Sequence, residues 1–368
     1  MTKKLCIHIG HYKTGTTALQ VFLARNPGFL AQHGVEYSSL FLHHAKHSCL
    51  AFSLCRAAGV TKLMHGYRDP TPAPDLWEQL FAHVRASAQE TVVVSSEELI
   101  RIGEFPEACA QLQQIAARCP DIEVTVVAYL RSPASHLRSW YNQLVKMGIP
   151  VSDFTTAVRG EIERIHLDYD LALAPWIAAF GAENLVLRDY DAARRGGDTG
   201  IYQDFLGVLG LPFPAGLNLP EGDPNPRIDD RAVELVRMAQ NLGLARTTIE
   251  AISEQAAQFL AQQDAQAARG LPDFDAVCAR IDGGLERIAG VGASNVDIAA
   301  FRARLPQAED RALVDQTQMT GFVLAELLAL RKRINRTLPA LTERLALLEA
   351  RLDMVAPPET EAETGAEG

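Results

Sequence analysis

Residues 7–19 carry the clearest chemical pattern of the chain, Ile-His-Ile-Gly-His-Tyr-Lys-Thr-Gly-Thr-Thr-Ala-Leu. The pattern predicts a buried strand, a loop between Gly10 and Gly15, and a helix that begins with two threonines. Backbone N–H groups converge at a helix start, and the helix dipole makes that point positive. Lys13 adds a mobile cation to this loop. We therefore expect a site for a diphosphate-like anion, and its further ligands are Thr14, Gly15, Thr16 and Thr17.

The position of the lysine decides which anhydride the loop suits. The spacing from Gly10 to Gly15 matches the G-x-x-x-x-G of a phosphate-binding loop, but Thr16 follows where a Walker A loop has lysine. A P-loop-type nucleotide kinase or NTPase is therefore an alternative and not the first choice. A second alternative is a non-catalytic nucleotide-binding scaffold that acts through its C-terminal helices.

A second anion site is predicted where the strand at 124–130 ends in Arg131-Ser132-Pro133. Ser132 suits the N-cap and Pro133 the first position of the following helix. Ser139 comes seven residues after Ser132, so the two side chains lie on one helix face, two turns apart. Arg131 and Ser139 could together hold a second phosphate group.

Short apolar segments at 5–9, 91–95, 124–130 and 185–187 alternate with amphipathic helical segments. This order predicts an α/β fold of the P-loop-like three-layer type, with a central parallel sheet and a helical C-terminal extension. Ligands of such sheets bind at the carboxyl ends of the strands. Gly10, Ser95 and Arg131 would all lie at that edge.

The domain boundaries follow from shifts in composition. A run rich in proline and glycine at 211–226 ends the predicted core, residues 1–225, and a helical region is expected over 226–356. Within it, residues 324–355 form a heptad-like seam that is apolar except for Arg331 and is interrupted at Pro339, which should kink the helix or start another. The seam is compatible with two arrangements, a helical hairpin that packs on the core and a homodimeric coiled coil. The tail, 357–368, has four glutamates and no basic residue, and should be disordered.

Composition excludes several classes of function. The net charge of −10 disfavours nucleic-acid binding, and no apolar run approaches the roughly 18 residues that a membrane span needs. The six cysteines have no C-x-x-C spacing and no signal-peptide pattern opens the chain, so we expect a cytoplasmic protein. His43, His44 and His47 are close in sequence, but no carboxylate or thiol completes a ligand set, and no metal is expected.

The two anion motifs together lead to a family. Tyr12-Lys13-Thr14-Gly15-Thr16-Thr17 resembles the 5′-phosphosulfate-binding loop of sulfotransferases that use 3′-phosphoadenosine 5′-phosphosulfate (PAPS). The segment 131–139 resembles their 3′-phosphate site, and 187–191 is similar to the strand whose tyrosine lies near the adenine. The resemblance covers residues 4–215. It implies that PAPS is held by Lys13, Gly15, Thr16 and Thr17 at the phosphosulfate, by Arg131 and Ser139 at the 3′-phosphate, and by Tyr190 at the base. The Arg-Lys-Gly motif of cytosolic members has no clear counterpart here, although Arg227 is a candidate.

The chemistry of sulfuryl transfer suits these residues. A lysine can neutralise the oxygens of the breaking anhydride without a metal, and the acceptor hydroxyl needs a base on the opposite side of the sulfur. The segment 94–99, Val-Ser-Ser-Glu-Glu-Leu, stands where relatives carry a catalytic histidine or glutamate. Glu97 and Glu98 compete for this role. A capping box from Ser95 to Glu98 would occupy Glu98, so Glu97 is preferred, with His47 and His8 in reserve.

The resemblance thus implies an enzyme that moves a sulfuryl group from PAPS to a hydroxyl-bearing acceptor. The segment with two glutamates looks more like that of glycan-type relatives than that of aryl-type relatives. A carbohydrate is therefore the expected acceptor.

Overall fold

The computed structural model describes residues 2–61, 63, 67–152, 154–222, 227–267 and 311–355, together with the single residues 279, 282, 299 and 303. The chain divides into two compact units, Met1–Ile228 and Asp229–Gly368. Each unit is described by itself. The predicted tail, 357–368, lies outside the described residues.

The first unit is built around a parallel sheet in the order β2-β3-β1-β4-β5. Its strands are β1 (Lys3–His8), β2 (Val35–Tyr37), β3 (Thr91–Ser95), β4 (Ile122–Leu130) and β5 (Leu185–Asp189). The predicted parallel sheet is therefore confirmed. Strand β2 escaped the sequence analysis because three residues are too few to show a periodic pattern.

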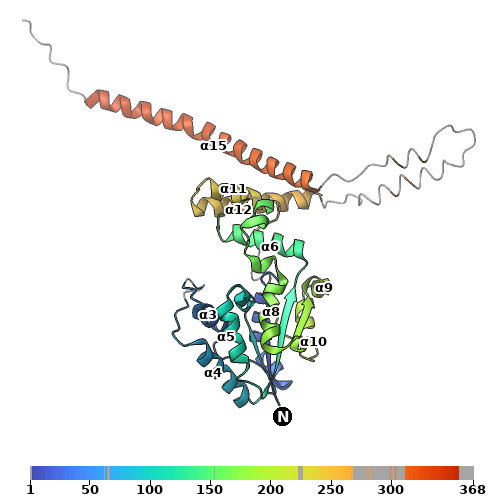
Figure 1. The fold of residues 1–368 in the computed structure, drawn as a ribbon. Coiled ribbons are helices and arrows are strands. Elements are labelled where there is room, and N and C mark those ends of the chain that lie inside the picture. The colour runs from blue at the N-terminus through green and yellow to red at the C-terminus, as the bar shows by residue number, and fades with distance from the viewer. Residues whose placement is uncertain are drawn as a thin grey trace, which may run out of the picture. The chain divides into compact units, whose positions relative to one another are not determined.

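Helices cover both faces of this sheet (Figure 1). The α-helices are α1 (Thr16–Arg25), α2 (Pro27–Gln32), α3 (Ser48–Ala57), α4 (Ala73–Ala86), α5 (Pro106–Ala116), α6 (Pro133–Lys146), α7 (Phe154–Gly160), α8 (Tyr169–Phe180), α9 (Tyr190–Arg195) and α10 (Gly200–Val208). The described residues also form the 3₁₀ helices η2 (Glu97–Glu104), η3 (Arg164–His166) and η4 (Ala182–Asn184).

Successive side chains of a strand point to opposite faces of the sheet, so helices pack on both faces and form three layers. Leu5 and Ile7 of β1 pack with Trp77 of α4 and Trp176 of α8 in one core. Cys6, between them in sequence, points to the other face and joins a core that includes side chains of α1 and α10. Both faces of β1 are thus apolar and buried, as expected for a central parallel strand, and the predicted α/β class is confirmed.

The second unit is helical in its described residues, with α11 (Val233–Asn241), α12 (Arg246–Ala267) and α15 (Arg311–Val355). Pro339 lies inside α15, so no second helix begins there, contrary to one of the two expectations. The seam positions Leu324, Leu327, Ile334, Leu338, Leu341, Leu345 and Leu348 are 47–59% exposed. Pairing of this seam with a second copy of the chain stays a prediction. None of the helices in the described part of the chain has the length and apolar character needed to cross a membrane.

Candidate functional site

The loop between β1 and α1 has a backbone that its glycines make possible. Gly10, Lys13 and Gly15 have positive φ angles of 70°, 64° and 73°. A Cβ atom on Gly15 would lie 3.1 Å from the ring of Tyr190, and one on Gly10 would lie 3.2 Å from Cα of Glu97. The two glycines therefore allow later parts of the chain to approach the loop closely.

Thr14 holds this loop together from inside. Its buried hydroxyl donates a hydrogen bond to the carbonyl of His11 over 2.6 Å and accepts one from the His11 N–H over 3.3 Å. Thr16 Oγ1 donates to the same carbonyl over 3.3 Å. The sequence analysis placed Thr14 among the ligands of the anion, but the structure gives its side chain this internal contact.

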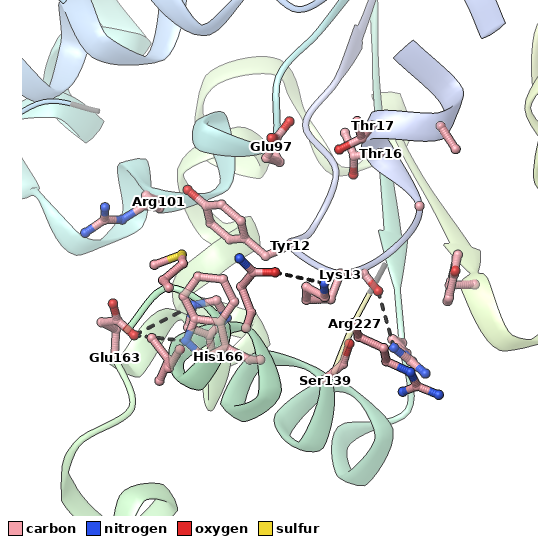
Figure 2. Close-up of a pocket in the computed structure, with 18 of the residues that line it drawn as sticks. Tyr12, Lys13, Thr16, Thr17, Glu97, Arg101, Ser139, Glu163, His166 and Arg227 are labelled. Atoms are coloured by element: carbon pink, nitrogen blue, oxygen red, sulfur yellow. Dashed lines mark hydrogen bonds and ion pairs between the residues drawn. The ribbon is translucent and has the colours of Figure 1, made fainter. Parts of the chain in front are cut away.

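A cavity of about 550 Å³ opens beside the loop, at the carboxyl ends of the strands. All the predicted site residues except Thr14 and Glu98 line it: Lys13, Gly15, Thr16, Thr17, Glu97, Arg131, Ser139 and Tyr190. Figure 2 shows Lys13 at its centre, with Glu97, Thr16 and Thr17 on one side of the loop and Ser139 and Arg227 on the other.

One end of the cavity is cationic. Lys13 Nζ donates to Gln143 Oε1 of α6 over 3.1 Å, and Arg131 reaches the carbonyl of Lys13 over 3.5 Å. The Arg131 guanidinium also lies 5.6 Å from the ring centre of Tyr190. Arg194 and Arg227 line this end as well. A chain with a net charge of −10 therefore gathers cations at one place, as a site for a polyanion requires.

The cavity-lining residues Arg194 and Arg227 differ in whether the sequence analysis identified them. Arg227 was a candidate by resemblance alone, and the cavity includes it. Arg194 was missed. Its signal is its spacing of four residues from Tyr190, which places both side chains on one face of α9.

Glu97 faces the cavity from the first position of η2, directly beyond β3. Its Oε2 accepts a hydrogen bond from Gln20 Nε2 over 2.9 Å, and its Oε1 accepts one from Lys46 Nζ over 3.0 Å. The side chain is therefore held from two sides at the edge of the cavity. A carboxylate in this setting can accept a proton from a bound hydroxyl.

Glu98 points away from the cavity and is 3% exposed. Its oxygens accept hydrogen bonds from Lys46 (2.5 Å), Ser96 Oγ (2.6 Å) and Ser48 Oγ (3.0 Å). Burial would raise the pKa of Glu98, but the Lys46 charge and these hydrogen bonds outweigh it and leave that pKa below its ordinary value. Both carboxylate oxygens of Glu98 thus accept hydrogen bonds within the fold, which gives this side chain a structural role.

The predicted capping box is wrong. The Ser95 N–H donates to His47 Nδ1 over 3.1 Å, so it is not available to Glu98. Strand β3 runs through Ser95, and η2 begins one residue later than a box would require, with Ser96 as its N-cap. The Glu98 carboxylate is held by the Ser96 hydroxyl instead.

The reserve histidines lie in the core, away from the cavity lining. His8 Nδ1 is 2.8 Å from Ser95 Oγ, and His47 Nε2 is 2.9 Å from the Ser38 carbonyl. Burial lowers the pKa of His8 to about 3 and also lowers that of His47. Neither imidazole is placed to reach an acceptor in the cavity.

The other end of the cavity combines aromatic rings with charged side chains. Trp140 stacks on His166 with ring centres 3.9 Å apart, and the ring of Tyr12 lies 5.0 Å from that of Trp140. Trp140 Nε1 donates to Glu163 Oε2 over 3.1 Å. Figure 2 shows Tyr12, Arg101, Glu163 and His166 together on this side. The sequence analysis missed this end because its residues come from separate segments and match no motif.

No protein-family model matches this chain, and no curated protein matches it. Among solved structures, it is similar to a sulfotransferase from Alicyclobacillus acidocaldarius, at 15% identity and a TM-score of 0.38, over 68% of this chain and 100% of that one. It is also similar to the sulfotransferase domain from the curacin biosynthetic pathway, at 13% identity and a TM-score of 0.30, over 59% of this chain and 77% of that one.

Proposed function

We propose that this chain is a sulfotransferase that moves a sulfuryl group from PAPS to a hydroxyl of an acceptor. One observation carries the proposal. Lys13 of the first anion loop and the pair Arg131 and Ser139 of the second open onto one cavity, and Glu97 stands on its wall. Two anion sites with a carboxylate beside them fit a donor with a phosphosulfate and a 3′-phosphate.

The cationic end would hold the donor. Lys13, with the N–H groups at the start of α1, binds the phosphosulfate, and Arg131 and Ser139 bind the 3′-phosphate. Arg194 and Arg227 add charge at this end. Tyr190, which packs against Gly15 and the Arg131 guanidinium, offers its ring to the adenine.

The reaction then follows from the position of the charges. The acceptor oxygen forms a bond to sulfur as the bond from sulfur to the bridging oxygen of the 5′-phosphate breaks. The electron pair stays on that phosphate oxygen, where the Lys13 ammonium neutralises it. The hydroxyl proton passes to the Glu97 carboxylate, which Gln20 and Lys46 orient.

A nucleotide kinase or NTPase fits this cavity less well. Such enzymes hold Mg²⁺ with a loop hydroxyl and a carboxylate. Glu97 is paired with Lys46, and Asp191, another carboxylate of the lining, lies 3.5 Å from Arg131. Charge neutralisation at the phosphates therefore falls to protein cations, which supports sulfuryl transfer without a metal.

A carbohydrate is the acceptor that we propose. Tyr12 and Trp140 line the cavity, and aromatic side chains in a lining pack well against the apolar side of a sugar ring. Arg101 and Glu163 stand beside them and can pair with hydroxyl or carboxylate substituents. The aromatic end and Glu97 belong to the same cavity, so an acceptor bound there lies near the base.

The test is transfer of label from PAPS, labelled in the sulfuryl group, to a panel of oligosaccharides, phenols and aliphatic alcohols. We expect labelled product with a glycan hydroxyl, at a rate that added Mg²⁺ does not change. γ-labelled ATP is the matched donor control, and it should give no labelled product. Phosphoryl transfer from ATP that EDTA abolishes, with no transfer from PAPS, would contradict the proposal.

A further inference from the structure

Three histidines that are far apart in sequence meet beside the cavity. His11 follows β1, His136 lies in the first turn of α6, and His166 ends η3. Their side chains are buried, with exposed fractions of 1%, 1% and 3%. One ring nitrogen of each lies within 4.8 Å of those of the other two.

The nitrogen positions suit a common ligand. His136 Nε2 and His166 Nδ1 are 3.1 Å apart. Zinc binds histidine nitrogen at about 2.0–2.1 Å, so two ligands of a tetrahedral ion lie about 3.3 Å apart. A shared proton would explain the 3.1 Å distance between His136 Nε2 and His166 Nδ1. The same distance is also close to that between two nitrogens bound to one zinc ion.

The second nitrogen of His11 supports the same arrangement. His11 Nε2 lies 3.1 Å from the carbonyl of Ile165, and this bond leaves Nδ1 as the nitrogen with the lone pair. His11 Nδ1 is buried and has no hydrogen-bond partner in the described part of the chain. A backbone carbonyl on the far nitrogen is a usual support of a metal-bound histidine. His136 Nδ1 is buried without a hydrogen-bond partner among the described residues, and His166 Nε2 lies 3.9 Å from Glu163 Oε2, beyond hydrogen-bond distance.

We propose that His11, His136 and His166 bind one Zn²⁺ ion. Three imidazoles are a ligand set for zinc or a similar first-row ion, while Mg²⁺ and Ca²⁺ need oxygen ligands that the cluster lacks. The ion ties the loop that carries Lys13 to α6 and η3. The reaction scheme routes no step through the ion, so metal content tests this site separately from the proposed sulfuryl transfer.

Metal content tests the proposal. We expect about one zinc per chain by mass spectrometry of the untagged protein after growth in zinc-supplemented medium. His136→Gln should reduce this to about a tenth or less, since two imidazoles bind weakly. The matched control is the double variant His43→Gln/His44→Gln, which removes two adjacent exposed histidines and should keep the full zinc content.

If the His136→Gln variant does not fold, the wild-type chain provides a second readout. Zinc added to the metal-free wild-type chain should raise its melting temperature, whereas Mg²⁺ at the same concentration should not. Co²⁺ should quench the part of the tryptophan emission that Trp140→Phe removes, because Trp140 stacks on His166. A wild-type chain that contains no zinc and shows no shift with added zinc overturns the proposal. So does His136→Gln with undiminished zinc.

Discussion

Replacing Lys13 with alanine should lower kcat/KM for PAPS by about 10²–10³-fold, the usual effect of removing one charge-stabilising group from a transition state. Lys13 lines the cavity, and in the proposed reaction its ammonium group neutralises the oxygen that receives the electron pair. The measurement is the initial rate of label transfer at varied PAPS concentration. Affinity for the desulfated product, measured by calorimetry, should fall in the same variant.

The variant isolates the charge because alanine keeps the Cβ atom. Lys13 has a φ of 64°, and alanine bears the same backbone strain there. Lys4→Ala is the matched control, since Lys4 Nζ makes an exposed pair with Glu90 at the far end of β1. Its rate should match that of the wild type. Unchanged donor affinity in Lys13→Ala would remove the basis of the site assignment.

Glu97→Gln should lower kcat by about 10²–10⁴-fold, the range for loss of a general base, with little change in affinity for the donor. Glutamine keeps the size of the side chain and its oxygen can still accept from Gln20 or Lys46. It cannot take the acceptor proton. Single-turnover rates at saturating PAPS give the rate constant of the chemical step without product release, and this constant should fall as kcat does.

Glu98→Gln is the control that separates the two glutamates. Glu98 is buried with Lys46, Ser48 and Ser96, so its change should destabilise the fold by about 3–5 kcal/mol, as breaking a buried ion pair does. The folded fraction should retain its turnover. A Glu98→Gln protein that folds but is inactive, beside an active Glu97→Gln protein, would reverse the assignment of the base.

The site residues that the sequence predicts are those positioned by one short stretch of consecutive residues. A strand, a glycine loop and a helix start build an anion site from about a dozen consecutive residues, so Lys13, Gly15 and Thr16 are visible without any tertiary information. Arg131 and Ser139 are visible for the same reason, because one strand end and one helix face position them. The parallel sheet then brings both loops to one edge.

The parts that the sequence does not predict depend on contacts between distant segments. The choice between Glu97 and Glu98 rests on their surroundings, because Glu97 lines the cavity whereas Glu98 is enclosed by Ser48 of α3 and by Ser96. The capping-box pattern gave the preference for Glu97 through a hydrogen bond that does not form. The histidine cluster and the stack of Trp140 on His166 likewise exist only after α6 and η3 pack together.

A crystal structure with 3′-phosphoadenosine 5′-phosphate bound is the most direct test of the central claim, that this cavity is the donor site. We predict the 5′-phosphate at about 2.7–3.2 Å from Lys13 Nζ, the 3′-phosphate on Arg131 and Ser139, and the adenine against Tyr190. Glu97 should face the side of the 5′-phosphate on which the sulfur would sit. A nucleotide bound outside the cavity, or one with its 5′-phosphate on Arg131 and away from Lys13, would contradict the account.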